Sequence, residues 1–111
     1  MPSAPDEILA ATRRIERILA NYEPGCDNKQ ARDETDKELS YIKERLSFGG
    51  DKISSIRDLT ATLYSPAKAQ RRYGPDGIRK VKHFIRLDCA SIEAMAEQIR
   101  TAGVRRGNGN L

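Results

Sequence analysis

A single stripe of apolar and small residues dominates the C-terminal part of the chain. Its members recur at three- and four-residue spacing for about seven turns, the period of an α-helix that buries one face. At a rise of 1.5 Å per residue, such a helix is roughly 40 Å long. We therefore expect it to be the spine of the core, with Phe84 and Leu87 widening its apolar face. The stripe consists of Ile78, Val81, Ile85, Cys89, Ile92, Met95, Ala96, Ile99 and Ala102.

The preceding residues predict three amphipathic helices and one short helix. Their apolar periodicity places them at residues 3–22, 28–47, 52–64 and 67–73. Ser3 and Asp6 form a start signal for the first of these helices. Ser65 and Pro66 are suited to the N-cap and first position of the short helix, and Gly74 to its end. The first half of the second helix, KQARDETDKE, is almost wholly charged, so we expect it to be exposed and comparatively mobile. Ion pairs at i,i+4 spacing, such as Arg32 with Asp36 and Asp33 with Lys37, are expected to support this helix.

These segments predict an all-α protein with one domain. A chain of 111 residues buries a single core. We predict a small antiparallel bundle of four helices plus a short extra helix. Residues 1–103 form the domain, and residues 104–111, which lack periodicity, form a disordered tail. A three-helix core with the second helix packed loosely at its side is the alternative.

Several classes of protein are disfavoured by the sequence. No segment approaches the ~20 apolar residues of a membrane span, and no secretory signal is visible, so we expect a soluble, cytoplasmic protein. Two cysteines make no disulfide framework: Cys89 falls on the apolar stripe, and Cys26 falls in a loop. The single His83 and the absence of paired cysteines argue against a zinc site. We predict no metal and no cofactor.

Charge is distributed unevenly along the chain. Residues 1–65 carry ten basic and twelve acidic side chains, whereas residues 66–111 carry ten basic and four acidic ones. Residues 66–86 alone contain seven Lys or Arg, opposed only by Asp76. Asymmetry of this kind is an argument about partners rather than about fold.

The candidate binding residues lie in this basic segment. Several follow the start of the last helix, where cations oppose the helix dipole and cost about 0.3–1 kcal/mol each. We take that cost as a sign that an external anion is bound there. The candidates are Lys68, Arg71, Arg72, Tyr73, Arg79, Lys80, Lys82, His83 and Arg86.

Three interpretations of the basic segment remain open. It can be a basic flank that has no partner and is exposed to solvent. Under the same interpretation, the acidic half of the second helix can pack against it within the molecule. It can bind a protein partner with an acidic face, or nucleic acid through residues 68–86. No activated nucleophile or acid–base pair is visible, so we predict no enzyme. We favour a non-enzymatic interaction or regulatory protein that binds a protein partner and also itself, as a two-fold dimer through the last helix.

Overall fold

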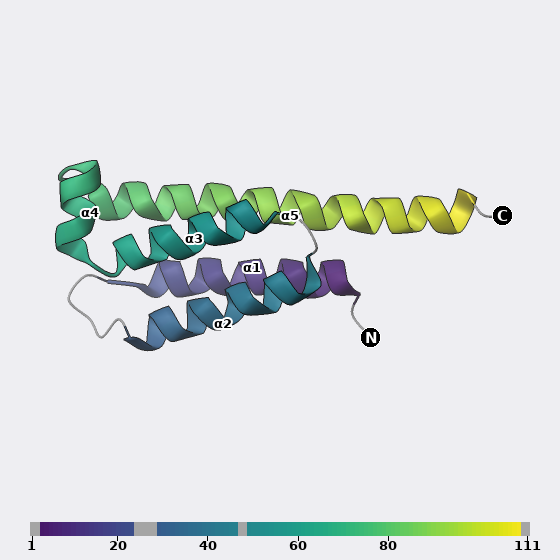
Figure 1. Cartoon of the computed structure of the whole chain (residues 1–111), viewed down its shortest axis with the longest axis horizontal. Helices are drawn as coiled ribbons and strands as arrows, with labels where there is room; N and C mark the ends of the chain where they lie inside the picture. The colour runs from purple at the N-terminus through teal and green to yellow at the C-terminus, as the bar shows by residue number, and fades with distance from the viewer. Residues whose placement is uncertain (1–2, 24–28, 47–48, 110–111) are drawn as a thin grey trace.

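The computed structural model describes residues 3–23, 29–46 and 49–109, with side chains described as far as Thr101. Within these ranges every regular element is a helix, which confirms the all-α prediction. The elements are α1 (Ala4–Asn21), α2 (Lys29–Arg45), α3 (Gly50–Leu63), α4 (Pro66–Tyr73) and α5 (Gly77–Gly109). The molecule measures 57 × 24 × 19 Å, and its long dimension follows α5 (Figure 1).

The helices pack so that α5 contacts α1, α3 and α4, while α2 contacts α1 and α3. Figure 1 shows α4 at the end of the molecule opposite both termini. The stripe predicted for the last helix lies in the core, since Val81, Ile85, Cys89, Ile92 and Ala96 are buried. The side chain of Ala102, at the end of that stripe, lies outside the described residues.

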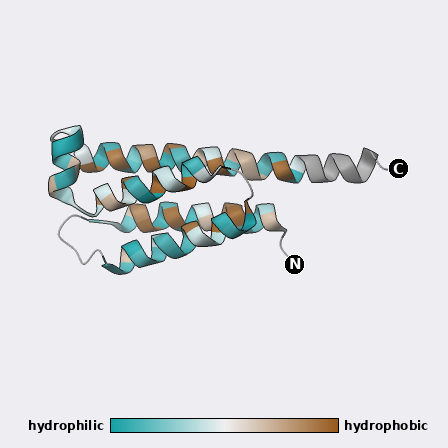
Figure 2. Cartoon of the chain, in the orientation of Figure 1, coloured by the Kyte–Doolittle hydropathy of each residue, from teal (hydrophilic) through white to brown (hydrophobic). Residues whose placement is uncertain are grey.

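The core is aliphatic, as the composition indicates. Hydrophobic positions recur along α1 and α5, whereas the first half of α2 is mostly hydrophilic (Figure 2). Within that half, Thr35 alone is fully buried, and its hydroxyl donates to the Ala31 carbonyl oxygen at 2.8 Å. The second half of α2 contributes the fully buried Leu39 and Ile42. The fully buried side chains of α1 and α3 include Ile8, Ile15, Leu19, Ile56 and Leu63.

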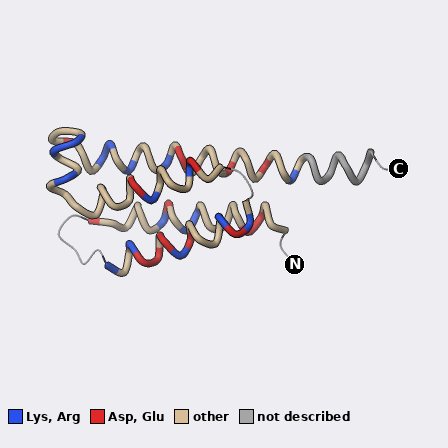
Figure 3. Tube along the Cα trace, in the orientation of Figure 1, with Lys and Arg blue, Asp and Glu red and all other residues tan. Residues whose placement is uncertain are grey.

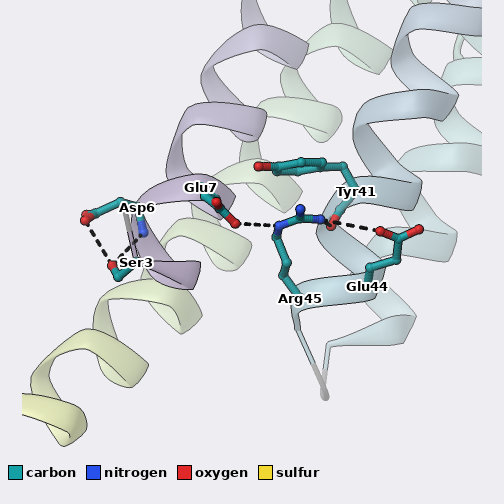
Figure 4. Close-up of polar contacts among 6 residues, drawn as sticks. All are labelled: Ser3, Asp6, Glu7, Tyr41, Glu44 and Arg45. Carbon is teal, nitrogen blue, oxygen red and sulfur yellow. Dashed lines mark hydrogen bonds and ion pairs between the residues drawn. The ribbon is translucent and has the colours of Figure 1, made fainter. Parts of the chain in front are cut away.

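The start of α1 is capped as the sequence predicts. Ser3 is the N-cap, and its hydroxyl oxygen accepts a hydrogen bond from the Asp6 backbone N–H at 3.4 Å. The same hydroxyl donates to the Asp6 carboxylate at 2.9 Å (Figure 4). This exchange satisfies one of the backbone donors that a helix start leaves without an intrahelical partner. Ser65 stands at the equivalent position before α4, but its side chain makes no capping hydrogen bond.

Arg45 joins the end of α2 to the start of α1. Its Nε donates to Glu7 at 2.6 Å, and its Nη1 donates to the Tyr41 carbonyl oxygen at 3.0 Å (Figure 4). The guanidinium also lies 3.4 Å from the centre of the Tyr41 ring, a cation–π contact. The hydrogen bond that Arg45 donates to Glu7 is the main reason that the pKa of Arg45 is raised.

The sharp corner between α4 and α5 depends on two glycines. Gly74 has φ +87°, in the region where side chains are strained. Gly77 begins α5 so close to α4 that a β-carbon there would overlap the Ala69 carbonyl oxygen. The corner therefore requires hydrogen in place of a side chain at residue 77, because a methyl group would push the two helices apart.

The structure differs from the sequence predictions in a few local details. The i,i+4 ion pairs expected within α2, such as Asp33 with Lys37, do not form among the described residues. The charges of α2 instead reach other helices: Glu38 pairs with Arg14 of α1 at 2.6 Å, and Asp36 pairs with Arg57 of α3 at 3.9 Å. The described helix α5 continues through a polar sequence to Gly109, beyond the expected end near residue 103. The assignment of residues 1–103 as the domain stays a prediction. Residues 24–28, which include Cys26, lie outside the described residues.

Candidate interaction surface

The nine candidate residues all lie on α4 and on the first turns of α5. We call this region, residues 68–86 of the two helices, the basic corner. Figure 3 shows the gathering of Lys and Arg at this end of the molecule, where α4 leads into α5. The structure divides the candidates into cations that bind within the molecule and cations that face outward.

Three of the cations contact other parts of the chain. The Lys80 ammonium donates to the Tyr73 carbonyl oxygen at the end of α4, at 3.0 Å. The Arg72 guanidinium donates to the Thr62 hydroxyl of α3 at 3.2 Å. The Lys82 ammonium donates to the Tyr22 carbonyl oxygen, just after the end of α1, at 3.0 Å.

These contacts explain part of the charge at the start of α5. The C-terminal end of a helix carries partial negative charge on its unpaired carbonyl groups. α1 has no basic residue in its own last turn, and Lys82 of α5 supplies the missing cation. Lys80 adds a further cation at the end of α4, whose last turn already contains Arg71 and Arg72. The unfavourable position of these two lysines in their own helix is thus offset by their favourable position at the ends of α4 and α1.

Other cations remain directed toward solvent. The side chains of Lys68 and Arg71 are exposed and make no hydrogen bond or ion pair within the described part of the chain. Arg86 is also exposed, and its charge acts on Glu16 of α1, where it opposes the rise of the Glu16 pKa. Arg79 pairs with Asp76 at 3.6 Å, but the two side chains are 85% and 64% exposed. A pair this exposed is worth little in water. These residues keep their charge available to a ligand.

Apolar side chains border the basic corner on α5. Phe84 is 37% exposed and Leu87 is 52% exposed. The Phe84 ring packs against the half-buried Tyr73 ring, with centres 5.6 Å apart, and the centre of the exposed His83 ring lies 6.1 Å from that of Phe84. Sequence reasoning assigned Phe84 and Leu87 to the border of the core stripe and did not include them among the site residues.

The acidic half of α2 does not neutralise the basic corner. Within the described residues, α2 contacts α1 and α3 and makes no contact with α4 or α5. The intramolecular neutralisation that we considered from the sequence therefore does not occur in this structure. The outward cations have no acidic helix of their own chain against them.

The buried thiol of Cys89 and the half-buried carboxyl group of Glu16 both have raised pKa values, and neither forms an activated site. Burial raises the pKa of the Cys89 thiol to about 12, and the nearby carboxylates Glu16 and Glu93 add to the shift. A thiol of that kind stays protonated and is a poor nucleophile. Burial, followed by the charge of Glu93, also raises the pKa of Glu16. The Thr12 hydroxyl lies 3.0 Å from Glu93 and joins this polar contact between α1 and α5.

Two further searches give negative results within the described residues. No group of three His, Cys, Asp or Glu side chains there is arranged to hold a metal ion. No helix in these ranges is long and apolar enough to cross a membrane.

Comparison with known proteins leaves the chain without an assigned relative. No protein-family model, curated protein or solved structure matches it. The residues of the basic corner and of α5 are therefore the basis on which we infer a function.

Proposed function

We propose that this chain is a non-enzymatic interaction protein that binds a protein partner through the outer face of α5 and the adjoining basic corner. The observation that carries the proposal is the exposure of Phe84 and Leu87 beside a group of outward-facing cations, of which Lys68 and Arg71 make no hydrogen bond or ion pair with the described residues. We further propose that the four longer helices form an antiparallel bundle around the core, with α5 as its spine. That bundle would hold the outer face of α5 rigid for binding.

The apolar part of this surface supplies the free energy of binding. Single exposed apolar residues are common and need no explanation. Here, however, two large side chains lie one turn apart on the same helix, and an aromatic neighbour, Tyr73, contacts the first. Full burial of a Leu or Phe side chain is worth about 1.5–3 kcal/mol. A partner that covers both Phe84 and Leu87 would therefore gain the free energy of burying two large apolar side chains.

The charges around this surface indicate the chemistry of the partner. Arg79, His83 and Arg86 follow one another along the exposed side of α5, and Lys68 and Arg71 extend the charge onto α4. A partner that places carboxylates beside its apolar contact would match this pattern. An amphipathic helix with an acidic flank has both features.

Pull-down from a lysate with the immobilised chain tests this proposal when two variants are compared. Leu87→Glu places a charge at the centre of the surface and should abolish capture of the partner. Ala20→Glu introduces the same charge at an exposed position on α1 and should leave capture unchanged. Equal capture by both variants, or no protein captured by a wild-type chain that also does not self-associate, would contradict the proposal.

Nucleic-acid binding through residues 68–86 is the second candidate function. The exposed Lys68, Arg71 and Arg86 favour it. The internal contacts of Arg72, Lys80 and Lys82 reduce the number of cations available for phosphates. With about three phosphate contacts, the slope of log affinity against log salt would be near −3 on duplex DNA. Loss of all captured material on nuclease treatment would favour this function over protein binding.

A further inference from the structure

The outer face of α5 carries a second stripe, on the side of the helix away from the core. Its residues follow the three- and four-residue spacing of the a and d positions of a coiled-coil heptad. No charged residue interrupts it, and all of its members except the half-buried Ser91 are exposed. The stripe consists of Phe84, Leu87, Ser91, Ala94, Gln98 and Thr101. We call it the outer stripe.

Two of the polar residues in the outer stripe are already satisfied by their own helix. The Ser91 hydroxyl donates to the Leu87 carbonyl oxygen at 3.2 Å, and the Thr101 hydroxyl donates to the Glu97 carbonyl oxygen at 2.9 Å. A buried hydroxyl is costly when it lacks a hydrogen bond, and these two would keep theirs in an interface. The stripe can therefore be covered without leaving these donors unpaired.

The outer stripe changes in size along its length. Phe84 and Leu87 are large, and the next two members, Ser91 and Ala94, are small. A second helix that runs in the opposite direction along this face would place its small residues against the large ones. A helix that runs in the same direction would place large against large and leave a gap over the small pair. Close packing of an interface therefore favours the antiparallel arrangement.

The charge of α5 changes sign along the same length. Residues 77–86 contain four cations and no carboxylate, whereas residues 87–99 contain three carboxylates and no cation. Figure 3 shows the blue part of α5 next to α4 and the red part beyond it. Asp88 and Glu93 contact α3 and α1, whereas Glu97 remains 54% exposed and pairs within α5 with the equally exposed Arg100 at 3.6 Å. Antiparallel pairing of two copies brings Glu97 of each toward the basic half of the other.

We infer that the partner of this surface is a second copy of the same chain, paired antiparallel along the outer stripe. This inference names the partner and therefore rests on the proposed function. In the register that matches both size and charge, Phe84 lies opposite the partner's Ala94, and Leu87 lies opposite the partner's Ser91. His83 then lies beside the partner's Glu97. The two-fold axis passes near residue 89, in line with the isologous interface of a symmetric dimer.

Sedimentation equilibrium tests whether the dimer exists and whether it uses the outer stripe. The wild-type chain should be dimeric at high micromolar concentration. Ala94→Glu places a charge in the seam and should weaken dimerisation at least about tenfold, the loss that 1.4 kcal/mol produces. Ala20→Glu should dimerise as the wild type does. Both positions are exposed, so circular dichroism should show that each variant keeps its helices.

Cross-linking tests the direction of pairing. In a Cys26→Ser background, Ala90→Cys lies near the two-fold axis, and a short bismaleimide should join the two copies. Thr101→Cys lies far from the axis and should not cross-link to itself. Efficient cross-linking at both positions would mean a parallel pair and would overturn the inference.

The outcomes separate this inference from the proposed function. A wild-type chain that is strictly monomeric, yet captures another protein through Leu87, overturns self-pairing and leaves the proposed function standing. A dimer that survives Ala94→Glu unchanged overturns self-pairing through the outer stripe. A monomer that captures no protein overturns both.

Discussion

The α1–α2 side of the molecule and the basic corner both carry many cations, and they use them differently. On the α1–α2 side, Arg14 and Arg45 reach across to carboxylates of the neighbouring helix, each at 2.6 Å. In the basic corner, Lys80 and Lys82 reach backbone carbonyl groups at helix ends, and Lys68 and Arg71 make no hydrogen bond or ion pair with the described residues. Positive charge is balanced on one side of the molecule and left in excess on the other.

The difference shows that a cluster of cations in a sequence can contain two populations with separate roles. One population stabilises the fold by binding carbonyl groups at the ends of other helices. These contacts offset the unfavourable interaction of the same cations with the dipole at the start of α5. The other remains for a ligand. The number of charges in the sequence does not distinguish these two populations. The structure distinguishes them, because it shows which ammonium groups contact a carbonyl oxygen. The predictions below test this division, beginning with the core that both sides share.

Ile85→Ala should produce the largest loss of stability. The side chain is fully buried on α5, directly beneath the basic corner. Large-to-small changes in a core cost about 2–5 kcal/mol. Urea unfolding followed by circular dichroism measures the change. A cost near zero would show that the core below the corner is already loosely packed. Ser54→Ala, at an exposed position of α3, should have little effect and is the control.

Gly77→Ala should be the next most destabilising change, because it forces α4 and α5 apart. The added methyl group would overlap the Ala69 carbonyl oxygen. Overpacking of this kind costs about 1–3 kcal/mol. Gly50→Ala meets no neighbouring atom at the start of α3 and is the matched control. If both variants unfold at the same urea concentration, the close approach of the two helices is not required.

Lys82→Met should cost less, about 1 kcal/mol, since it removes one hydrogen bond to a carbonyl group and one cation from the end of α1. Lys68→Met removes an exposed cation without an internal contact and should change stability by less than about 0.5 kcal/mol. Comparison of the two unfolding free energies directly tests the division of the basic corner. Equal losses would show that the contact between Lys82 and Tyr22 contributes nothing to the fold.

Glu16→Gln should produce the smallest change, and one that depends on pH. Burial and the charge of Glu93 raise the pKa of Glu16 in the folded state. The folded chain therefore holds this proton more tightly than the unfolded chain does. The resulting stability is fully present below the ordinary glutamate pKa and is lost as the pH rises through the folded value.

The glutamine variant lacks this titration. Its melting temperature relative to the wild type should therefore rise from acidic toward neutral pH. Because other carboxyl groups titrate in both proteins, the difference between the two melting curves is the quantity to follow. A difference that stays constant with pH would contradict the raised pKa.

Much of the fold can be predicted from the sequence because the apolar periodicity is strong. Ile85 and Ile92 lie in the core as the spacing predicts, and Ser3 caps α1 as predicted. The cation contacts are less predictable. Lys82 and Tyr22 are far apart in sequence, and only the packing of α1 on α5 brings them together. The internal ion pairs of α2 were predicted wrongly for the same reason, since Asp36 finds Arg57 on another helix.

The outer stripe illustrates a different limit. Its spacing is present in the sequence, but the more hydrophobic core stripe of the same helix obscures it. Phe84 and Leu87 belong to the outer stripe and were assigned to the border of the core stripe. Their exposure in the structure separates the two faces. Charge also identifies the second face, because the carboxylates and cations of α5 lie mainly beside it rather than on it.

The buried thiol of Cys89 offers a way to time the separation of the helices. With its pKa raised to about 12 and its side chain enclosed, it is protected from alkylating reagents while the chain is folded. In a Cys26→Ser chain, Cys89 is the single thiol. The rate at which an alkylating reagent modifies it therefore reports how often α5 separates from the helices that cover Cys89. Comparison of this rate between monomer and dimer would show whether pairing through the outer stripe slows the exposure of the core-facing side of α5.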